Sequence, residues 1–152
     1  EHESNMLFVR LDFAKIVGRA YHTELSMKPV GNFSFLIRRY ALPDLFSGKL
    51  SAILTREAME GKEKKERFKG RDFFDLLWFL EKGVQPNWKY LEEITGLGKL
   101  EALEKVEQKI QKVTPVYLEK DLLPFFADPN FVKQFAGNFH QLYRGYASVL
   151  LT

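Results

Sequence analysis

The sequence predicts an α+β protein: a short β-sheet portion of two strands, followed by a predominantly helical bundle of five to six helices. Two observations predict this fold class. Apolar residues alternate with other residues in segments before Leu42, and they recur at helical spacing after it. Strands that come first and helices that follow are typical of α+β proteins. The 152 residues suffice for one compact unit, with strands in residues 1–41 and the helical domain in residues 42–152.

Two segments have the alternation of a strand, MLFVRLDFAKI and FSFLIRRYA. The apolar residues that share a face are Leu7, Val9, Leu11 and Phe13 in the first, and Phe33, Phe35 and Ile37 in the second. Turn-forming residues at positions 29, 31 and 32 separate the second strand from what precedes it. Because two strands alone are marginally stable, either they extend a sheet formed by further sequence or the helices cover them.

In the rest of the chain, segments with apolar residues at helical spacing are separated by residues that start or end helices. Pro43 suits a first helical turn, and Gly83 suits a helix end. Residues 60–69, with Gly61 and the charged run KEKKER, are expected to form a loop or a frayed helix end. The predicted helices cover residues 43–60, 72–82, 87–95, 98–113 and 115–124, and the last begins at about residue 130.

The composition excludes several classes of protein. With no cysteine, the chain has no disulfide and no thiolate metal site, and it fits the reducing cytoplasm. No apolar run is long enough to span a membrane, and no signal peptide is visible, so we expect a cytoplasmic protein without a membrane partner. The net charge of +3 does not by itself indicate a nucleic-acid binder. The 14 phenylalanines indicate a bulky core or an aromatic surface that awaits a partner.

The stretch RFKGRDFFDLLWFLEKG contains the first candidate site residues. Asp72 and Asp75 lie three residues apart and share a helix face. Aspartate in a first helical turn is favoured by the helix dipole, which explains one of them without any function. Lys69 and Arg71 crowd the same helix end, where cations are disfavoured, and a carboxylate–guanidinium pair or an anionic ligand would relieve that conflict.

Two further residues are candidates for binding a charged ligand. Lys49 lies among apolar residues of the first predicted helix, next to Gly48. It is either an amphipathic lysine with its amine in water or a lysine held in a cleft to meet phosphate oxygens. Asp12 lies on the mixed face of the first predicted strand, where it is either an ordinary exposed carboxylate or a ligand for Mg²⁺. The three histidines have no metal-ligand spacing.

Three stretches stand in order along the chain. They are LPDLFSGKLSAILTR, then KGRDFFDLLWFLEKGVQPNWKYL after a charged spacer, then the tail YLEKDLLPFFADPNFVKQFAGNF. Together they resemble the second half of AbiEii/AbiGii-type toxin nucleotidyltransferases, of the DNA polymerase β-like nucleotidyltransferase superfamily. The resemblance covers most of the chain from about Leu7 onward.

The resemblance implies a role for each candidate. Lys49 matches the lysine that contacts the nucleotide phosphates. Asp72 matches the catalytic aspartate of the last motif, and Asp75 stands beside it in that motif. Arg71 matches the arginine of the motif, an ion-pair or phosphate contact, with Lys69 next to it. Asp12 matches a strand carboxylate that follows the metal-binding pair.

One motif of the family is missing from this sequence. The Gly-Ser turn and the Asp-x-Asp strand, which hold the catalytic metals, do not occur in these 152 residues. We therefore expect the C-terminal part of a nucleotidyltransferase or a split subunit, an expectation that the first residue, Glu1, supports. Mg²⁺ or Mn²⁺ should bind with the NTP only when the N-terminal half is present, and the isolated chain should be inactive.

The expected function is transfer of a nucleoside monophosphate from an NTP to an acceptor, either RNA such as a tRNA end or a protein hydroxyl. The partners expected are the NTP, possible RNA, an antitoxin protein, and a second copy or a partner fragment that completes the sheet. The alternative is a non-catalytic helical module for antitoxin binding or oligomerisation. In the enzyme hypothesis, Lys49, Asp72 and Asp75 should converge on one surface with Asp12, because consecutive helices joined by short connections pack as neighbours.

Overall fold

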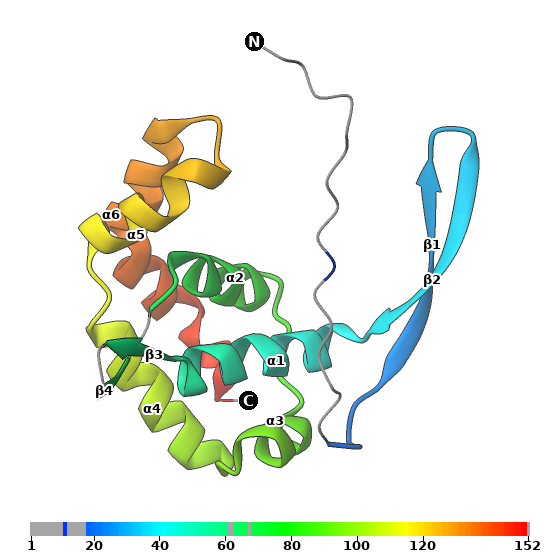
Figure 1. Ribbon diagram of the computed structural model, residues 1–152, viewed down its shortest axis with the longest axis horizontal. Helices are drawn as coiled ribbons and strands as arrows, with labels where there is room; N and C mark the ends of the chain where they lie inside the picture. The colour runs from blue at the N-terminus through cyan, green and yellow to red at the C-terminus, as the bar shows by residue number, and fades with distance from the viewer. Residues whose placement is uncertain (1–10, 12–17, 61–62, 67, 152) are drawn as a thin grey trace.

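The computed structural model describes residues 11, 18–60, 63–66 and 68–151, and it confirms the α+β class (Figure 1). A hairpin of two strands leads into a bundle of helices. The strands are β1 (Thr23–Val30) and β2 (Phe33–Tyr40). The helices are α1 (Leu42–Thr55), α2 (Gly70–Glu81), α3 (Trp88–Thr95), α4 (Lys99–Gln111), α5 (Pro115–Leu122) and α6 (Pro129–Tyr146), with 3-10 turns η1 (Leu123–Phe125) and η2 (Ala147–Leu150).

The strand predicted over residues 33–41 is confirmed as β2, but it pairs with a segment in which the sequence predicted no strand. β2 pairs antiparallel with β1, in register from Thr23 opposite Tyr40 to Val30 opposite Phe33. Gly31 adopts a φ of 57° in the two-residue turn, a conformation that favours glycine. β1 was missed because Pro29 argues against a strand, yet an edge strand tolerates proline. The strand predicted at residues 7–13 lies outside the described residues except for Leu11, which is exposed.

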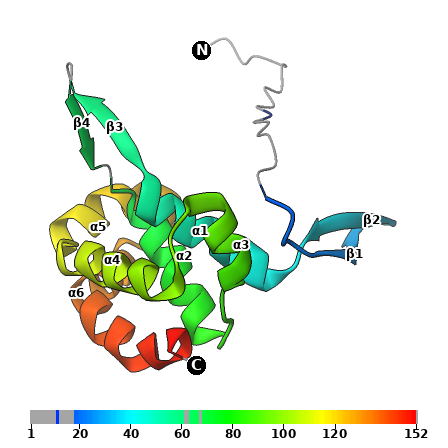
Figure 2. The same ribbon diagram turned by 90° about the horizontal axis from the view of Figure 1, so that it is seen from below.

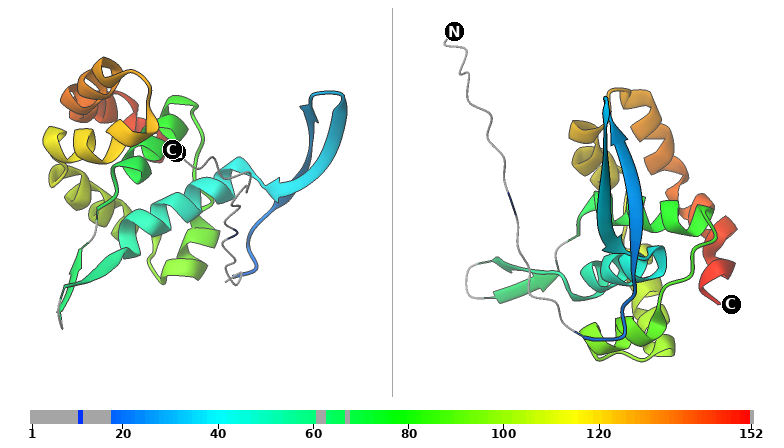
Figure 3. Two further views of the ribbon diagram at one scale, coloured as in Figure 1. Left: turned by 45° about the horizontal axis from the view of Figure 1, so that its top comes forward. Right: turned by 90° about the vertical axis from the view of Figure 1, so that its right-hand side faces the viewer.

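The β1–β2 hairpin stands away from the helices (Figures 1 and 3). It carries apolar side chains on both of its faces. The register places Leu25, Met27 and Leu36 on one face, and Val30, Phe33, Phe35 and Ile37 on the other. Each of these side chains is between 45% and 71% exposed. A sheet that is apolar on both faces is typical of one covered on both sides, so this hairpin retains apolar surface that its own helices do not bury.

A polar network anchors the base of the hairpin to the helices. The buried carboxylate of Asp44 in α1 accepts hydrogen bonds from the backbone N–H of His22 (3.1 Å) and from Nδ2 of Asn87 (2.6 Å). The same Asn87 amide donates to the carbonyl oxygen of Ala20 (2.7 Å), and its oxygen caps α3. Because the buried carboxylate is fully engaged, the network fixes where the chain enters the helical part.

A second carboxylate secures the same entry segment. Oε2 of Glu93 in α3 accepts hydrogen bonds from the backbone N–H groups of Arg19 (2.6 Å) and Ala20 (2.9 Å). These two bonds hold the pKa of Glu93 below its usual value, because they favour the charged carboxylate. The rings of Tyr21, Tyr40 and Tyr90 meet beside this contact at centroid distances from 5.2 to 6.4 Å.

The hydrophobic core lies around α1 and α2. α1 packs against α2, α3 and α4, while α2 also packs against α5 and α6. Phe46 of α1 and Phe79 of α2 stack with ring centroids 4.7 Å apart, and both are buried. Burying a side chain of this size contributes roughly 1.5–3 kcal/mol, so these contacts fix α1 and α2 side by side.

The predicted helix over residues 43–60 was wrong beyond Thr55. A second hairpin, β3 (Glu57–Glu60) and β4 (Glu63–Glu66), follows α1 in place of the expected helix end and loop. The β3–β4 hairpin leaves one end of α1, and the β1–β2 hairpin lies at the other end (Figures 2 and 3). Residues 57–66 are mostly charged and have no apolar stripe, so packing does not hold them in a helix against the bundle.

The other predicted helices are confirmed to within a few residues. α2 begins at Gly70, two residues before the predicted start, and ends before Gly83, whose φ is 64°. The fifth helix ends at Leu122, and Pro124 lies in the 3-10 turn that follows it. Within the described residues, the structure has no helix that is both long and apolar enough to cross a membrane.

Candidate functional site

The candidate residues meet along the seam between α1 and α2. The C-terminal half of α1 lies against the N-terminal half of α2, so the two helices are antiparallel neighbours. Lys49 lies in α1, and Arg56 follows the last residue of that helix seven positions later. Asp72 and Asp75 share a face of α2. The seam therefore carries two cation–carboxylate pairs, one turn apart along α2. Of the four residues expected to converge, Lys49, Asp72 and Asp75 lie along this seam, and Asp12 lies outside the described residues.

The first pair joins Arg56 and Asp72. Nη1 of Arg56 donates to Oδ2 of Asp72, whose side chain is only 8% exposed. Arg56 follows the last turn of α1 and Asp72 lies in the first turn of α2, so each charge faces the helix end that favours it. The carboxylate is thereby held in one place at the start of α2.

The second pair joins Lys49 and Asp75. Nζ of Lys49 lies 2.5 Å from Oδ2 of Asp75, and the side chains are 44% and 33% exposed. Apart from the chain neighbours of Gly48 and the backbone of α1 itself, no described atom lies within 4 Å of where a side chain on Gly48 would begin, so the surface beside Lys49 is open. This ammonium is therefore accessible to an anion from solution, whereas the Arg56–Asp72 pair is largely covered.

The guanidinium beside Asp72 is not the one that the sequence suggested. Arg71 was expected to pair with a carboxylate or to contact phosphate, but its guanidinium carbon lies 5.1 Å above the centre of the Phe125 ring. Lys69 contributes its backbone to the site, since its carbonyl oxygen accepts the N–H of Asp72 at 2.9 Å. Phe125 thus stabilises the Arg71 cation at the start of α2, whereas the guanidinium that pairs with Asp72 belongs to Arg56, which was not among the predicted residues.

A close approach of α5 limits the space at the start of α2. A Cβ on Gly70 would lie 3.1 Å from Cβ and 3.2 Å from Oδ2 of Asp121. These distances are tighter than ordinary van der Waals contact, so a larger residue here would require Asp121 of α5 to shift by a few tenths of an ångström. Gly70 therefore allows α5 to approach the turn that carries Asp72.

The described residues do not fit a metal site by themselves. Nowhere in the described part of the chain do three histidine, cysteine, aspartate or glutamate side chains gather as metal ligands would. The two carboxylates of the seam each face a cation, Arg56 or Lys49, which would repel a divalent ion. Asp12, the predicted metal ligand, lies outside the described residues. No step that uses a metal is derived from this seam.

Comparison with known proteins identifies the family. Residues 8–146 match the family model described as nucleotidyl transferase AbiEii toxin, type IV toxin–antitoxin system. Neither the curated proteins nor the solved structures that were compared give a match. The matched residues include both hairpins and all of the seam between α1 and α2. Since they make up most of its length, the chain belongs to the AbiEii family of nucleotidyl transferase toxins.

Proposed function

We propose that this chain forms the phosphate-contacting half of a nucleotidyltransferase that transfers a nucleoside monophosphate from an NTP to an acceptor. The observation that carries the proposal is the open Lys49–Asp75 pair directly beside the covered Arg56–Asp72 pair. Membership of a nucleotidyl transferase family supports it. An NTP would be met in the cytoplasm, which agrees with a chain that has no cysteine.

Lys49 is the residue that binds the triphosphate in this proposal. Its ammonium is a compact point charge on a flexible stem, so it can turn from Asp75 toward a phosphate oxygen without moving the helix. In the absence of nucleotide, Asp75 holds the Lys49 ammonium beside the site. Arg71, which is exposed in the first turn of α2, would add a second phosphate contact in this proposal.

Asp72 has the catalytic role in this proposal. The Arg56 guanidinium and the start of α2 fix its carboxylate, and fixed charge needs no reorganisation when a reaction proceeds. A bound metal ion would neutralise the charge that develops on the transferred phosphoryl group. Its ligands belong, in our proposal, to Asp12 and to the Asp-x-Asp motif that these 152 residues lack. We therefore propose that the 152-residue chain binds nucleotide without transferring it.

The acceptor in this proposal is RNA, such as a tRNA end, or a protein hydroxyl. The charged run before α2 stands next to the seam in sequence and would suit a phosphate-rich acceptor. The family is a toxin of a toxin–antitoxin system, which implies an antitoxin as its counterpart.

The exposed apolar hairpin favours a second candidate function. Seven apolar side chains of β1–β2 remain exposed on both faces, as expected of a module that binds an antitoxin or a copy of itself. In this alternative the seam residues have no catalytic role. The two functions differ in a simple observable, the binding of nucleotide by Lys49.

Titration calorimetry with ATP in the absence of metal tests the proposal. The Lys49→Ala variant should weaken ATP binding by roughly tenfold or more, because a charge-assisted contact to phosphate contributes about 1.5–3 kcal/mol. Lys105→Ala is the matched control, since Lys105 pairs with Glu101 on α4 and its side chain is 45% exposed. The control should bind ATP as the original chain does. Equal ATP binding by all three proteins, or by none of them, would favour the non-catalytic module.

A further inference from the structure

Phe125 is an exposed phenylalanine that lies beside the start of α2. Its side chain is 57% exposed, and it is the last residue of the 3-10 turn η1. Pro124 precedes it, and the fixed φ of proline restricts the backbone of this turn. The guanidinium carbon of Arg71 lies 5.1 Å from the centre of the Phe125 ring. Because more than half of the side chain stays in water, its contact with Arg71 is more informative than its burial.

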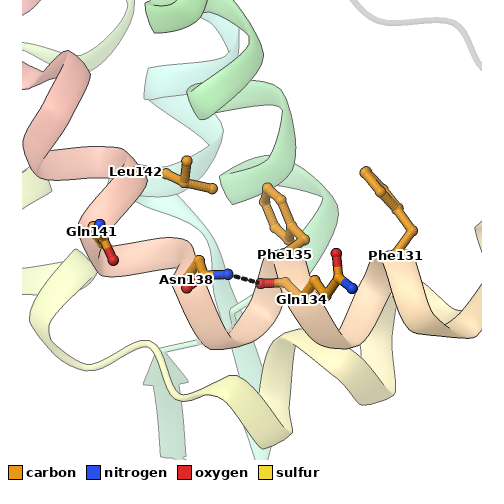
Figure 4. Close-up of a pocket in the computed structure, with 6 residues that line it drawn as sticks. All are labelled: Phe131, Gln134, Phe135, Asn138, Gln141 and Leu142. Atoms are coloured by element: carbon orange, nitrogen blue, oxygen red, sulfur yellow. Dashed lines mark hydrogen bonds between the residues drawn. The ribbon is translucent and has the colours of Figure 1, made fainter.

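The neighbouring residue, Phe126, anchors this segment to two helices. Its ring centre lies 5.0 Å from that of Phe74 in α2 and 5.2 Å from that of Phe131 in α6. Phe135 joins the same cluster at 5.1 Å from Phe74, and Figure 4 shows Phe131 and Phe135 on one side of α6. These contacts fix the backbone that follows α5 against the first turns of α2. Phe125, next to Phe126 in the chain, is therefore held at the start of α2.

The contact with Phe125 leaves the hydrogen-bond donors of Arg71 without a carboxylate partner. Among the side chains that the structure describes, no carboxylate forms a salt bridge with Arg71, which is exposed. Arg56 differs in both respects, since its guanidinium pairs with Asp72 and is only 27% exposed. A guanidinium carries five N–H donors in a planar fork that matches the oxygens of a phosphate. Arg71 is thus positioned by a ring while its donors stay available to an anion from solution.

Arg71 also lies close to the open ion pair of the α1–α2 seam. It precedes Asp75 by four residues, so the two share a face of α2, and Asp75 holds the Lys49 ammonium. Two cations that reach water therefore flank Asp75, one from each helix. A triphosphate has several charged groups and can engage both cations at once. An arginine that a ring already holds in place loses less side-chain freedom when the anion binds.

We propose that Phe125 is a positioning residue for the triphosphate: its ring holds the Arg71 guanidinium where it binds phosphate together with Lys49. This inference rests on the proposed nucleotide site and adds to it a residue from a distant segment of the chain. The ring acts through the arginine and does not contact the nucleotide. Phe125 should therefore matter only while Arg71 is present, and it should matter equally for any ligand with the same phosphates.

Titration calorimetry of the 152-residue chain with ATP and with inorganic tripolyphosphate, both without metal, tests the positioning role. Arg71→Ala should weaken the binding of both ligands roughly tenfold, because it removes a charge-assisted contact. Phe125→Ala should weaken both by about two- to fivefold, the size of an exposed cation–π interaction. Phe125→Leu, which keeps an apolar side chain but has no ring, should lose as much affinity. Phe125→Trp should bind at least as tightly as the unmodified chain.

Two comparisons separate positioning from a general effect on the fold. In the Arg71→Ala background, Phe125→Ala should have no further effect on either affinity, because the ring then has no cation to hold. Lys99→Ala is the matched control for loss of a cation from an aromatic ring, since Nζ of Lys99 lies 5.2 Å from the centre of the Trp88 ring. This control should bind both ligands as the unmodified chain does. Rescue by Phe125→Trp would not be expected of a residue that only supports the fold.

The two ligands and the Lys49→Ala variant give each failure its own signature. If Phe125→Ala loses affinity for ATP but not for tripolyphosphate, the ring stacks on the base, and the positioning role is overturned. Additive losses in the double variant would also overturn it, because Phe125 would then act without Arg71. Unchanged affinity in Phe125→Ala beside a weakened Lys49→Ala would overturn this inference alone. Unchanged affinity in Lys49→Ala would overturn the proposed function, and this inference with it.

Discussion

The two ion pairs of the α1–α2 seam should contribute unequally to stability. Arg56→Met removes the guanidinium but keeps an apolar stem, and it leaves the Asp72 carboxylate without its partner at 8% exposure. Breaking a buried pair in this way typically costs about 3–5 kcal/mol. Arg56 is 27% exposed, so water can reach the vacated position, and we expect a smaller loss, about 2–3 kcal/mol.

A double-mutant cycle measures the coupling energy between Arg56 and Asp72. Asp72→Asn should cost about 1–2 kcal/mol, and the double variant about as much as Asp72→Asn alone, because no unpaired carboxylate remains; the coupling energy is therefore about 2–3 kcal/mol. The corresponding cycle with Lys49→Met and Asp75→Asn is the matched comparison on the same seam. Its side chains are 44% and 33% exposed, so its coupling energy should be only about 0.2–1 kcal/mol.

Urea denaturation followed by circular dichroism gives the free energy of unfolding of each variant. The reasoning requires the Arg56–Asp72 coupling to exceed that of Lys49–Asp75. Equal couplings, or a larger one for the exposed pair, would refute the division of the seam into a covered structural pair and an open pair that is available to a ligand.

Three further predictions concern packing, the polar network and pH. Gly70→Ala should destabilise the protein by about 1–3 kcal/mol, because the alanine Cβ would press on Asp121. Gly137→Ala should stabilise it by about 0.5–1 kcal/mol, because there is open space at that Cβ. Thermal unfolding measures both changes. Asn87→Ala should cost about 2–4 kcal/mol in urea unfolding, since it removes the cap of α3 and takes one of the two hydrogen-bond donors from the buried Asp44 carboxylate. An unchanged midpoint would contradict this. The pKa of Glu93 is lower in the folded state than its ordinary value of 4.5. Its contribution to stability is therefore present above about pH 4.5 and is lost as pH falls through the folded pKa. Glu93→Gln should accordingly show a smaller fall in urea midpoint between neutral and acidic pH than the unmodified chain, and an equal fall would contradict the contact.

The sequence predicted the helices well because each carries an apolar stripe that must be buried. α2 shows this clearly: Leu76 and Leu80 repeat at helical spacing, and both are buried. The convergence of Lys49 with Asp75 was also predictable, since two consecutive helices pack as neighbours. The strand β1 was not predictable in the same way. Its stability comes from pairing with β2, and Pro29 conceals the pattern.

Arg56 is the residue of the site that sequence reasoning missed. The sequence pattern placed it inside a helix continuing to residue 60, whereas α1 ends directly before it. The available signal was its separation of seven residues from Lys49, which would put both cations on one face of the predicted helix. Its partner could not be read from the sequence, because the choice between Arg56 and Arg71 for Asp72 depends on how α1 and α2 pack. The Phe125 ring, which engages Arg71, comes from a distant segment.

The most direct test of the central claim is to map where a nucleotide touches the chain. Nuclear magnetic resonance spectra of the ¹⁵N-labelled 152-residue chain, titrated with ATP, report the backbone amides that a bound triphosphate perturbs. Our account predicts the largest shifts in the turn of α1 around Lys49 and in the first two turns of α2, with loss of these shifts in Lys49→Ala and not in Lys105→Ala. Shifts confined to other elements, or an unchanged response in Lys49→Ala, would contradict the claim that the α1–α2 seam is a nucleotide site.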